Sequence, residues 1–212
     1  MQLSERVHIS NMSGKLDGLR AINTNTLTNP LCNVLHQSRD DFICAFCYSM
    51  YMLQTHRSKC AESWQRNSDL LSGSLLHKTQ IPTFVDKAIR LHAHGEIIDE
   101  YHLINFFRIA ENNPLTTFSL WSKNKKVVRA VLKQYDKPSN LILIYSNGSI
   151  NKPMSAPPKG FDKVFQNVSP DRYTDIQNCT GQTCVSCMLC YNKGTDVITE
   201  AVKLRYKRKE LK

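Results

Sequence analysis

The sequence lacks the features that define several large classes of protein. No apolar run reaches the roughly eighteen residues that a membrane-spanning helix needs. The opening stretch "MQLSERVHISNMSGK" has no apolar centre of the kind found in signal peptides, so we expect a cytoplasmic protein in a reducing compartment. A phosphate-binding glycine loop, a G-x-S-x-G elbow and an H-E-x-x-H pair are also missing, which removes the commonest motif-based hypotheses for an enzyme.

Cysteine and positive charge are what the sequence has instead. The 212 residues include eight cysteines and carry a formal net charge of +10. Cysteines clustered in a reducing compartment are more often metal ligands or redox groups than disulfides. Much of the positive charge lies in "WSKNKKVVRAVLKQYDK" and in the C-terminal "KLRYKRKELK". The basic C-terminus suggests a nucleic acid or an acidic protein as partner, and the alternative is a solvated helix end.

The middle of the chain alternates between strand and helix patterns, which predicts a parallel sheet built by crossover connections. We expect an α/β fold, either a partial (β/α) barrel or an open, mostly parallel sheet of about five or six strands, because a full barrel needs about 250 residues. Weaker strand candidates are "GLRAINTNTL", the segment near Phe42 and "KVFQNVS". The predicted strands are 84–96, 116–124 and 140–148, and the predicted helices are 99–113 and 125–137.

Residues 1–170 are expected to form the α/β domain, and residues 171–212 a cysteine-rich segment followed by a basic helix. The two parts form either separate units or one integrated domain. Polar residues follow each predicted strand, at the edge where parallel sheets bind ligands. They are His92, His94, Gly95 and Glu96, then Trp121, Ser122 and Lys123, then Tyr145, Ser146 and Asn147.

The C-terminal cysteines, Cys179, Cys184, Cys187 and Cys190, form a C-x4-C-x2-C-x2-C array. Such short steps are typical of iron-sulfur ligands. A structural zinc site uses the same number of thiolates, and disulfides or free thiols are the third alternative. We expect an auxiliary four-iron cluster closed by four thiolates.

The N-terminal group consists of Cys32, Cys44 and Cys47. Three thiolates on a four-iron cluster leave one iron open to a substrate or cofactor, as catalytic zinc keeps an open position. Cys60 is a candidate fourth ligand, but its helical context favours a packed small residue. A single composite site of all seven thiolates is the remaining alternative.

The stretch "CAFCYS" resembles the second half of the C-x3-C-x-Φ-C motif of radical S-adenosylmethionine enzymes. Eleven residues separate Cys32 from Cys44, where that motif has three. The downstream "HAHGE" is similar to the Gly-Gly-Glu type motif that holds the cofactor's amino group, with Gly95 and Glu96 matching and His94 at the first glycine. The resemblance implies S-adenosylmethionine as cofactor, with His92, His94, Ser122, Lys123 and Tyr145 on the substrate side.

Most of the chain resembles a phage and prophage family described as gene product 88-like. The similar stretches are "GKLDGLRAINTNTLTNPLC", "ICAFCYSMYM", "LHAHGEI", "FSLWSKN" and the final cysteine array. That family usually has Gly-Asp where this chain has Gly95 and Glu96. The resemblance implies a phage-encoded protein in the cytoplasm of the host cell.

Three functions remain open from the sequence. The first is a radical S-adenosylmethionine-like enzyme with two four-iron clusters and an external electron donor. The second is a non-enzymatic iron-sulfur redox or nucleic-acid-binding factor. The third is a structural protein whose fold is stabilised by bound zinc. The substrate, the reaction and the oligomeric state are not specified by these patterns.

Overall fold

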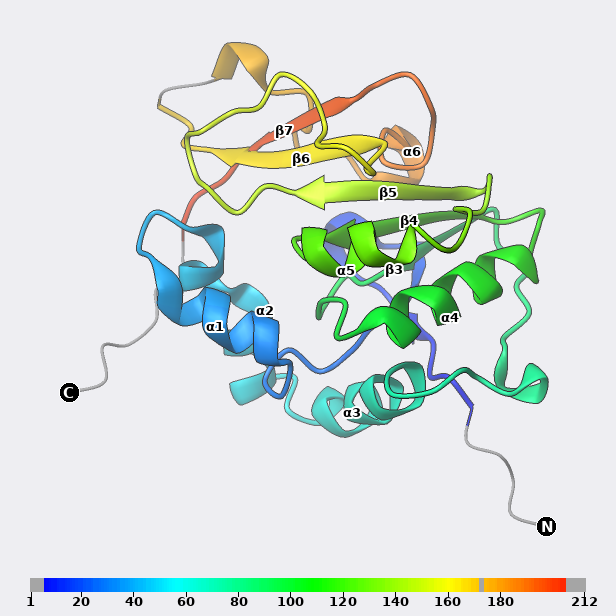
Figure 1. Ribbon diagram of the computed structural model, residues 1–212. Coiled ribbons are helices and arrows are strands. Elements are labelled where there is room, and N and C mark those ends of the chain that lie inside the picture. The colour runs from blue at the N-terminus through cyan, green and yellow to red at the C-terminus, as the bar shows by residue number, and fades with distance from the viewer. Residues whose placement is uncertain (1–5, 172–173, 205–212) are drawn as a thin grey trace.

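The computed structural model describes residues 6–171 and 174–204. Its centre is an open sheet of seven strands that lie in the order in which they occur in the chain (Figure 1). Only β1 is antiparallel to its neighbour, and every other pair is parallel. The strands are β1 (Ser10–Asn11), β2 (Arg20–Ile22), β3 (Ala88–Leu91), β4 (Thr117–Ser122), β5 (Leu141–Ser146), β6 (Lys163–Val168) and β7 (Val197–Ala201).

The strand order places the main helices on one face of the sheet. Each right-handed crossover adds the next strand at the same edge, so every crossover helix lies on the same side. Figure 1 shows α3, α4 and α5 together below the sheet, with α1 and α2 beyond the carboxyl end of β5. The α-helices are α1 (Pro30–Ser38), α2 (Tyr48–Gln54), α3 (Cys60–Leu71), α4 (Glu100–Glu111), α5 (Lys125–Val131) and α6 (Cys184–Cys187). Four 3-10 turns, η1 (Gly14–Leu16), η2 (Ile43–Phe46), η3 (Lys78–Gln80) and η4 (Thr174–Ile176), complete the regular structure of the described residues.

Local sequence signals set the helix starts. The Asn29 side chain accepts a hydrogen bond from the backbone N–H of Cys32, and Pro30 occupies the first turn of α1. The Asp99 side chain caps α4 in the same way, and Asn124 caps α5. None of the described helices is long and apolar enough to cross a membrane.

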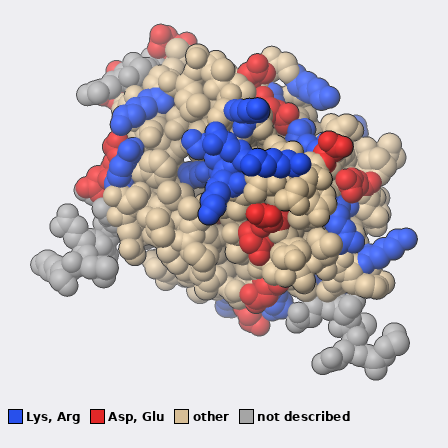
Figure 2. Space-filling view, viewed as in Figure 1, with Lys and Arg blue, Asp and Glu red and all other residues tan. Residues whose placement is uncertain are grey.

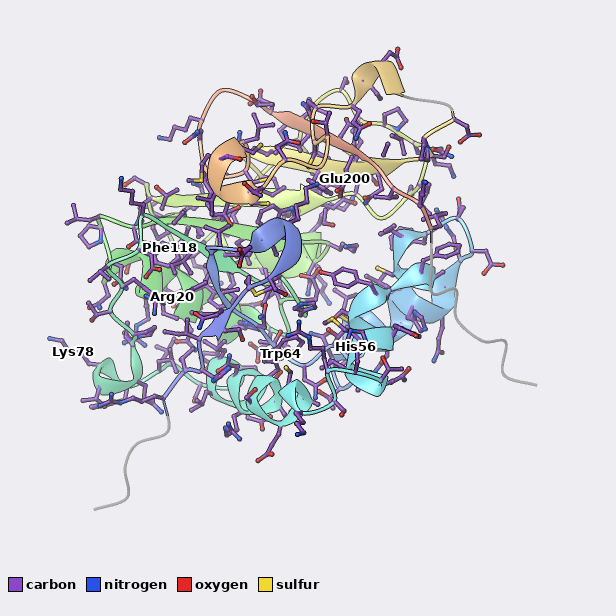
Figure 3. The ribbon with its side chains drawn as sticks, turned by 180° about the vertical axis from the view of Figure 1, so that it is seen from behind. Arg20, His56, Trp64, Lys78, Phe118 and Glu200 are labelled. Atoms are coloured by element: carbon purple, nitrogen blue, oxygen red, sulfur yellow. The ribbon has the colours of Figure 1, made fainter. Side chains whose placement is uncertain are left out.

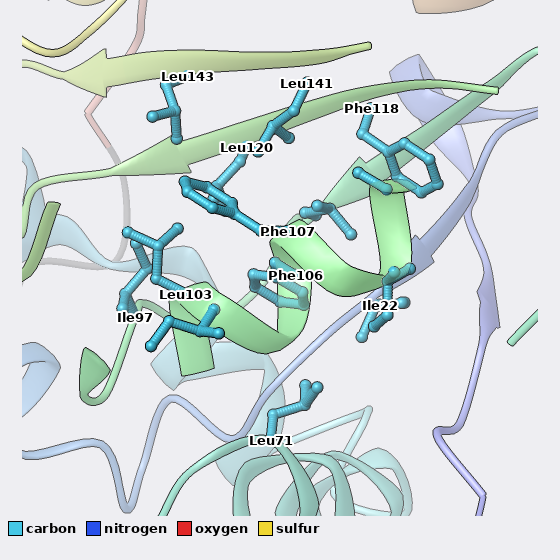
Figure 4. Close-up of a cluster of buried hydrophobic side chains, with 14 of the residues drawn as sticks. Ile22, Leu71, Ile97, Leu103, Phe106, Phe107, Phe118, Leu120, Leu141 and Leu143 are labelled. Carbon is cyan, nitrogen blue, oxygen red and sulfur yellow. The ribbon is translucent and has the colours of Figure 1, made fainter. Parts of the chain in front are cut away.

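The main core lies between the sheet and its helices (Figure 4). Phe106 and Leu103 of α4 pack there against Leu120 of β4 and Leu143 of β5, and all four side chains are fully buried. Burial of such side chains contributes about 1.5–3 kcal/mol each to folding. The opposite face of the sheet carries a smaller apolar cluster around Trp121, against which Cys190 packs.

The α/β class, the open sheet and the helix–strand alternation are confirmed, with shorter elements than predicted. The segment near Phe42 is not a strand, because it enters the turn η2 and makes only one antiparallel bridge, to Ser149. The sheet has seven strands instead of five or six, since Ser10–Asn11 adds β1 beside β2 and the C-terminal segment adds β7 beside β6. The predicted basic helix has no counterpart through residue 204, and residues 205–212 lie outside the described ones.

Candidate metal and ligand site at the carboxyl edge of the sheet

A cavity of about 780 Å³ opens at the carboxyl ends of the parallel strands. Parallel sheets place their ligands at this edge. His92, Gly95, Glu96, Trp121, Lys123 and Ser146 all line it, as their positions after the strands predicted. His94, Ser122, Tyr145 and Asn147 do not line it. The cavity therefore uses about half of the predicted rim.

The turn after β3 is fixed to the end of β2. The side-chain oxygen of Asn23 accepts hydrogen bonds from the backbone N–H groups of Ala93 and His94. Gly95 has φ of +100°, and a Cβ built on it would lie 2.0 Å from Oγ1 of Thr24. Only glycine fits this position, which explains the residue without reference to any ligand.

Glu96 ties the ends of β3 and β4 together. Its buried carboxylate accepts hydrogen bonds from the Ser122 hydroxyl at 2.6 Å, the Lys123 backbone N–H at 2.7 Å and the Ile97 backbone N–H at 2.8 Å. Burial raises the pKa of Glu96, although Lys123 and these donors act against the rise. The predicted cofactor ligand thus also has a structural role, in which it shapes the cavity rim.

His94 is packed away from the cavity. Its ring stacks on Trp64 with centroids 4.5 Å apart, and Nδ1 lies 3.0 Å from the Ser49 hydroxyl (Figure 3 labels Trp64 on α3). Tyr48 meets the same ring edge-on. His94 therefore joins the rim to α2 and α3, which is a packing role.

The other strand-end histidine forms a buried pair. Nε2 of His92 lies 3.2 Å from Nε2 of His102, and both rings contact Phe106. Burial lowers the pKa of His92 to about 3 and holds that of His102 well below its usual value. Both histidines are thus neutral at neutral pH.

This pair predicts acid sensitivity. As the pH falls below about 6.5, these histidines become protonated in the unfolded chain but stay neutral in the folded protein. The free energy of unfolding therefore decreases progressively until the pH reaches the folded-state pKa. Each such histidine adds up to about 1.4 kcal/mol per pH unit to the slope. His92→Asn, which tolerates the positive φ of 60° at this position, should flatten the slope in denaturant titrations between pH 7 and 5. A slope in His92→Asn equal to that of the wild type would contradict the assignment.

The N-terminal cysteines come from three short segments that pack together. Cys32 lies on α1, Cys44 in η2 and Cys47 between η2 and α2. Nδ1 of His36 lies 2.6 Å from the Cys44 carbonyl oxygen and joins α1 to η2. The pKa of Cys32 is raised far above its usual value, first by burial and then by the charges of Glu96, Cys47 and Cys44.

Lys123 is the cation of this group. Burial lowers the pKa of Lys123, but Cys44, Glu96, Cys32 and Cys47 outweigh burial and raise it. Its ammonium donates to the Ser146 hydroxyl at 2.8 Å. The three thiols, one carboxylate and one ammonium therefore act on one another electrostatically, and of these five groups Glu96 and Lys123 line the large cavity.

The segment that carries Cys44 is fastened to the loop after β5. The backbone N–H of Ile43 donates to the Gly148 carbonyl at 2.8 Å, and Ile150 N–H donates to the Asp41 carbonyl at 3.0 Å. The Phe42 ring lies directly on Gly148, where a Cβ would come within 1.8 Å of the ring. This contact positions the cysteine turn against the sheet.

A double-mutant cycle tests that contact. Gly148→Ala should destabilise the protein by about 1–3 kcal/mol, because the new methyl group collides with the ring. In a Phe42→Ala background the same change should cost much less, since the ring is absent. Chemical denaturation of the four proteins measures the coupling, and additive effects would show that Phe42 does not press on Gly148.

The four C-terminal cysteines surround a second, small cavity of about 20 Å³ together with Lys15, Trp121 and Tyr191. The Lys15 ammonium lies 3.0 Å from Sγ of Cys179 and 2.5 Å from Glu200 of β7; Figure 3 labels Glu200. Burial raises the pKa of Cys190 to about 12. Cys190 is thus protonated at neutral pH, and a metal that bound it would displace its proton.

All eight cysteines are free thiols, including Cys60 at the start of α3, which lines neither cavity. Within residues 6–171 and 174–204, no three His, Cys, Asp or Glu side chains are placed to hold one metal ion. Metal binding therefore stays a prediction. A single zinc needs sulfurs about 2.3 Å from one point, whereas a four-iron cluster spreads its thiolates over four irons.

Three residues of the site escaped the sequence patterns. Arg90 lines the large cavity, Lys15 contacts Cys179, and Tyr191 lines the small cavity. Arg90 did leave a signal, because a charged residue inside the apolar strand "AIRL" must face something other than the helices. Lys15 left none, since 164 residues separate it from Cys179.

The fold and the site together define an open, singly wound α/β protein with a large cavity at the carboxyl edge. Cys179, Cys184 and Cys190 line this cavity, and the N-terminal cysteines do not. A family model described as gene product 88 matches residues 19–172. The chain belongs to this family of phage gene products. No curated protein and no solved structure matches it.

Proposed function

We propose that the protein is an iron-sulfur protein with two four-iron clusters on opposite sides of one cavity, and that it acts as a radical S-adenosylmethionine-like enzyme. One observation carries the proposal. Cys179, Cys184 and Cys190 line the 780 Å³ cavity, and Ile43, Phe46 and Tyr48, the chain neighbours of Cys44 and Cys47, line it as well, although Cys44 and Cys47 themselves do not.

The donor set at the C-terminal array fits a cluster. Four thiols face one small cavity, and the hydroxyl of Tyr191 beside them is buried without a hydrogen-bond partner among the described residues. A buried hydroxyl without a partner costs free energy, and a thiolate or sulfide there would accept a hydrogen bond from it. The present space of about 20 Å³ holds little more than one water-sized sphere, so loading requires the array to move outward.

At the other group, Cys32, Cys44 and Cys47 would hold the first cluster and leave one position open. Bound there, a reduced cluster would supply the electron for cleavage of the sulfonium of S-adenosylmethionine. The chain itself would orient the cofactor through the turn at Gly95 and Glu96. Lys123 would offset part of the negative charge of the thiolates, because it lies within their electrostatic reach.

A basic surface favours a second candidate, a non-enzymatic iron-sulfur factor that binds nucleic acid. Lys125, Lys126 and Arg129 of α5 are exposed. Figure 2 shows Lys and Arg side chains gathered in one patch where Figure 1 places α5. Binding through this patch would weaken steeply with salt, because phosphate contacts release counterions.

Anaerobic reconstitution tests the shared part of both candidates. We expect about eight irons and about eight sulfides per chain, four of each for every cluster. About four irons would indicate a single composite centre. Colourless protein that contains zinc and no iron would contradict both candidates and favour the zinc-stapled alternative.

A further inference from the structure

Arg90 places a positive charge on the floor of the large cavity. It lies on β3, whose neighbouring residues Ile89 and Leu91 enter the main core, so Arg90 points to the opposite face. Its guanidinium carbon lies 3.3 Å from the centroid of the Trp121 ring. Its Nε donates to the His92 carbonyl at 3.0 Å. The guanidinium is thus held in place by a ring below and a carbonyl beside it.

No carboxylate among the described residues compensates this charge, since Arg90 takes part in none of their ion pairs. The two carboxylates that line the cavity are engaged elsewhere, Glu96 by Ser122 and two backbone N–H groups, and Glu200 by Lys15. Four cations line the same cavity, namely Lys15, Arg90, Lys123 and Lys203. Arg90 acts electrostatically on Cys184 and Cys190, but burial raises the pKa of both thiols. A partly buried guanidinium without a carboxylate partner favours an anion from outside the chain.

The rest of the cavity wall is largely aromatic and apolar. Trp121 and Phe165 line it on the sheet, and Phe46 and Tyr48 line it near the N-terminal cysteines. Sites for organic ligands combine such walls with a few polar anchors and commonly measure about 300–1,000 Å³. At about 780 Å³, this cavity has room for a second ligand beside a cofactor.

We propose that Arg90 anchors a carboxylate or phosphate group of the substrate, whose planar or apolar body lies against Trp121 and Phe165. The terminal nitrogens of a guanidinium bind either group through two parallel hydrogen bonds. Because Arg90 stacks on Trp121, the substrate anion binds at the end of the cavity next to that ring. This inference rests on the proposed function only in that it calls the bound molecule a substrate. The anion site itself does not depend on the proposed function.

Titration calorimetry of the full chain tests the site, with inorganic pyrophosphate and citrate as separate probes. We expect saturable binding of at least one probe, and the preferred probe identifies phosphate or carboxylate as the group. Arg90→Gln should weaken binding about tenfold or more, because it removes charge-assisted hydrogen bonds. Arg90→Lys, which keeps the charge but loses the planar fork, should recover part of the affinity. Lys78→Gln on the exposed turn η3 removes the same charge outside the cavity and should change nothing.

Iron content measured on the same samples separates this inference from the proposed function. Wild-type protein that binds a probe but holds no iron would refute the clusters and keep the anion site. Binding of neither probe at millimolar concentrations would overturn the anion site, as would equal affinity in wild type and Arg90→Gln. A third outcome is that the wild type binds no probe and that Arg90→Gln loses iron. This outcome would mean that Arg90 balances the charge of a cluster, and it would also overturn the anion site.

Discussion

Replacing Cys47 by serine is expected to remove one cluster, about four irons per chain, and to abolish any cleavage of S-adenosylmethionine. Serine keeps the size of the side chain but is a poor ligand for iron, so the three-thiolate site loses one of its ligands. The C-terminal array, which lies on the other side of the cavity, should keep its own iron. Iron and sulfide analysis after anaerobic reconstitution measures both outcomes, together with assay of 5′-deoxyadenosine.

Cys60→Ser is the matched control, because Cys60 lies on α3 and lines neither cavity. It should retain all iron and all activity. Loss of all iron in Cys47→Ser would show that the two cysteine groups hold one composite centre. Full retention of iron in Cys47→Ser would show that the N-terminal cysteines do not hold a cluster.

Gly95→Ala is expected to destabilise the protein by about 3 kcal/mol or more, which is the largest single loss we predict outside the cysteines. Two costs add up here. The φ of +100° is unfavourable for alanine, and the new Cβ would lie 2.0 Å from Oγ1 of Thr24. Because the turn also sets the position of Glu96, the variant should lose ligand binding in the cavity as well.

Gly73→Ala separates the two costs. Gly73 has φ of +80°, but a Cβ at this position would have no atom within 4 Å of it, so only the backbone cost of about 1 kcal/mol applies. Urea unfolding of both variants gives the difference. Equal losses would show that the contact with Thr24 relaxes freely and that the turn after β3 is less constrained than described.

The alternating part of the fold was predictable because its periodicity is strong. Helix α4 presents Leu103, Phe106 and Phe107 to one side, and the run around β5 is continuously apolar. Strand β7 was not predicted, since "VITEA" sits between a cysteine array and a basic tail and gains its burial from pairing with β6. Long-range pairing of this kind leaves little trace in a local pattern.

The site was predictable in its residues and less so in their roles. The positions of Glu96 and Lys123 after the strands correctly predicted that both residues line the cavity. The carboxyl ends of parallel strands meet at one edge of the sheet. His94 has the same kind of position but stacks on Trp64, a residue on a helix distant in sequence. Arg90 and Lys15 gain their significance only from neighbours that the fold brings to them.

The proposed function requires that the three-thiolate group bind a cluster with an open position for S-adenosylmethionine. The most direct test is electron spin resonance of the dithionite-reduced Cys184→Ser variant, in which only the N-terminal cluster should remain intact. We predict that added S-adenosylmethionine changes the cluster's signal and is cleaved to methionine and 5′-deoxyadenosine. An unchanged signal together with intact cofactor, in a protein that retains about four irons, would contradict the account.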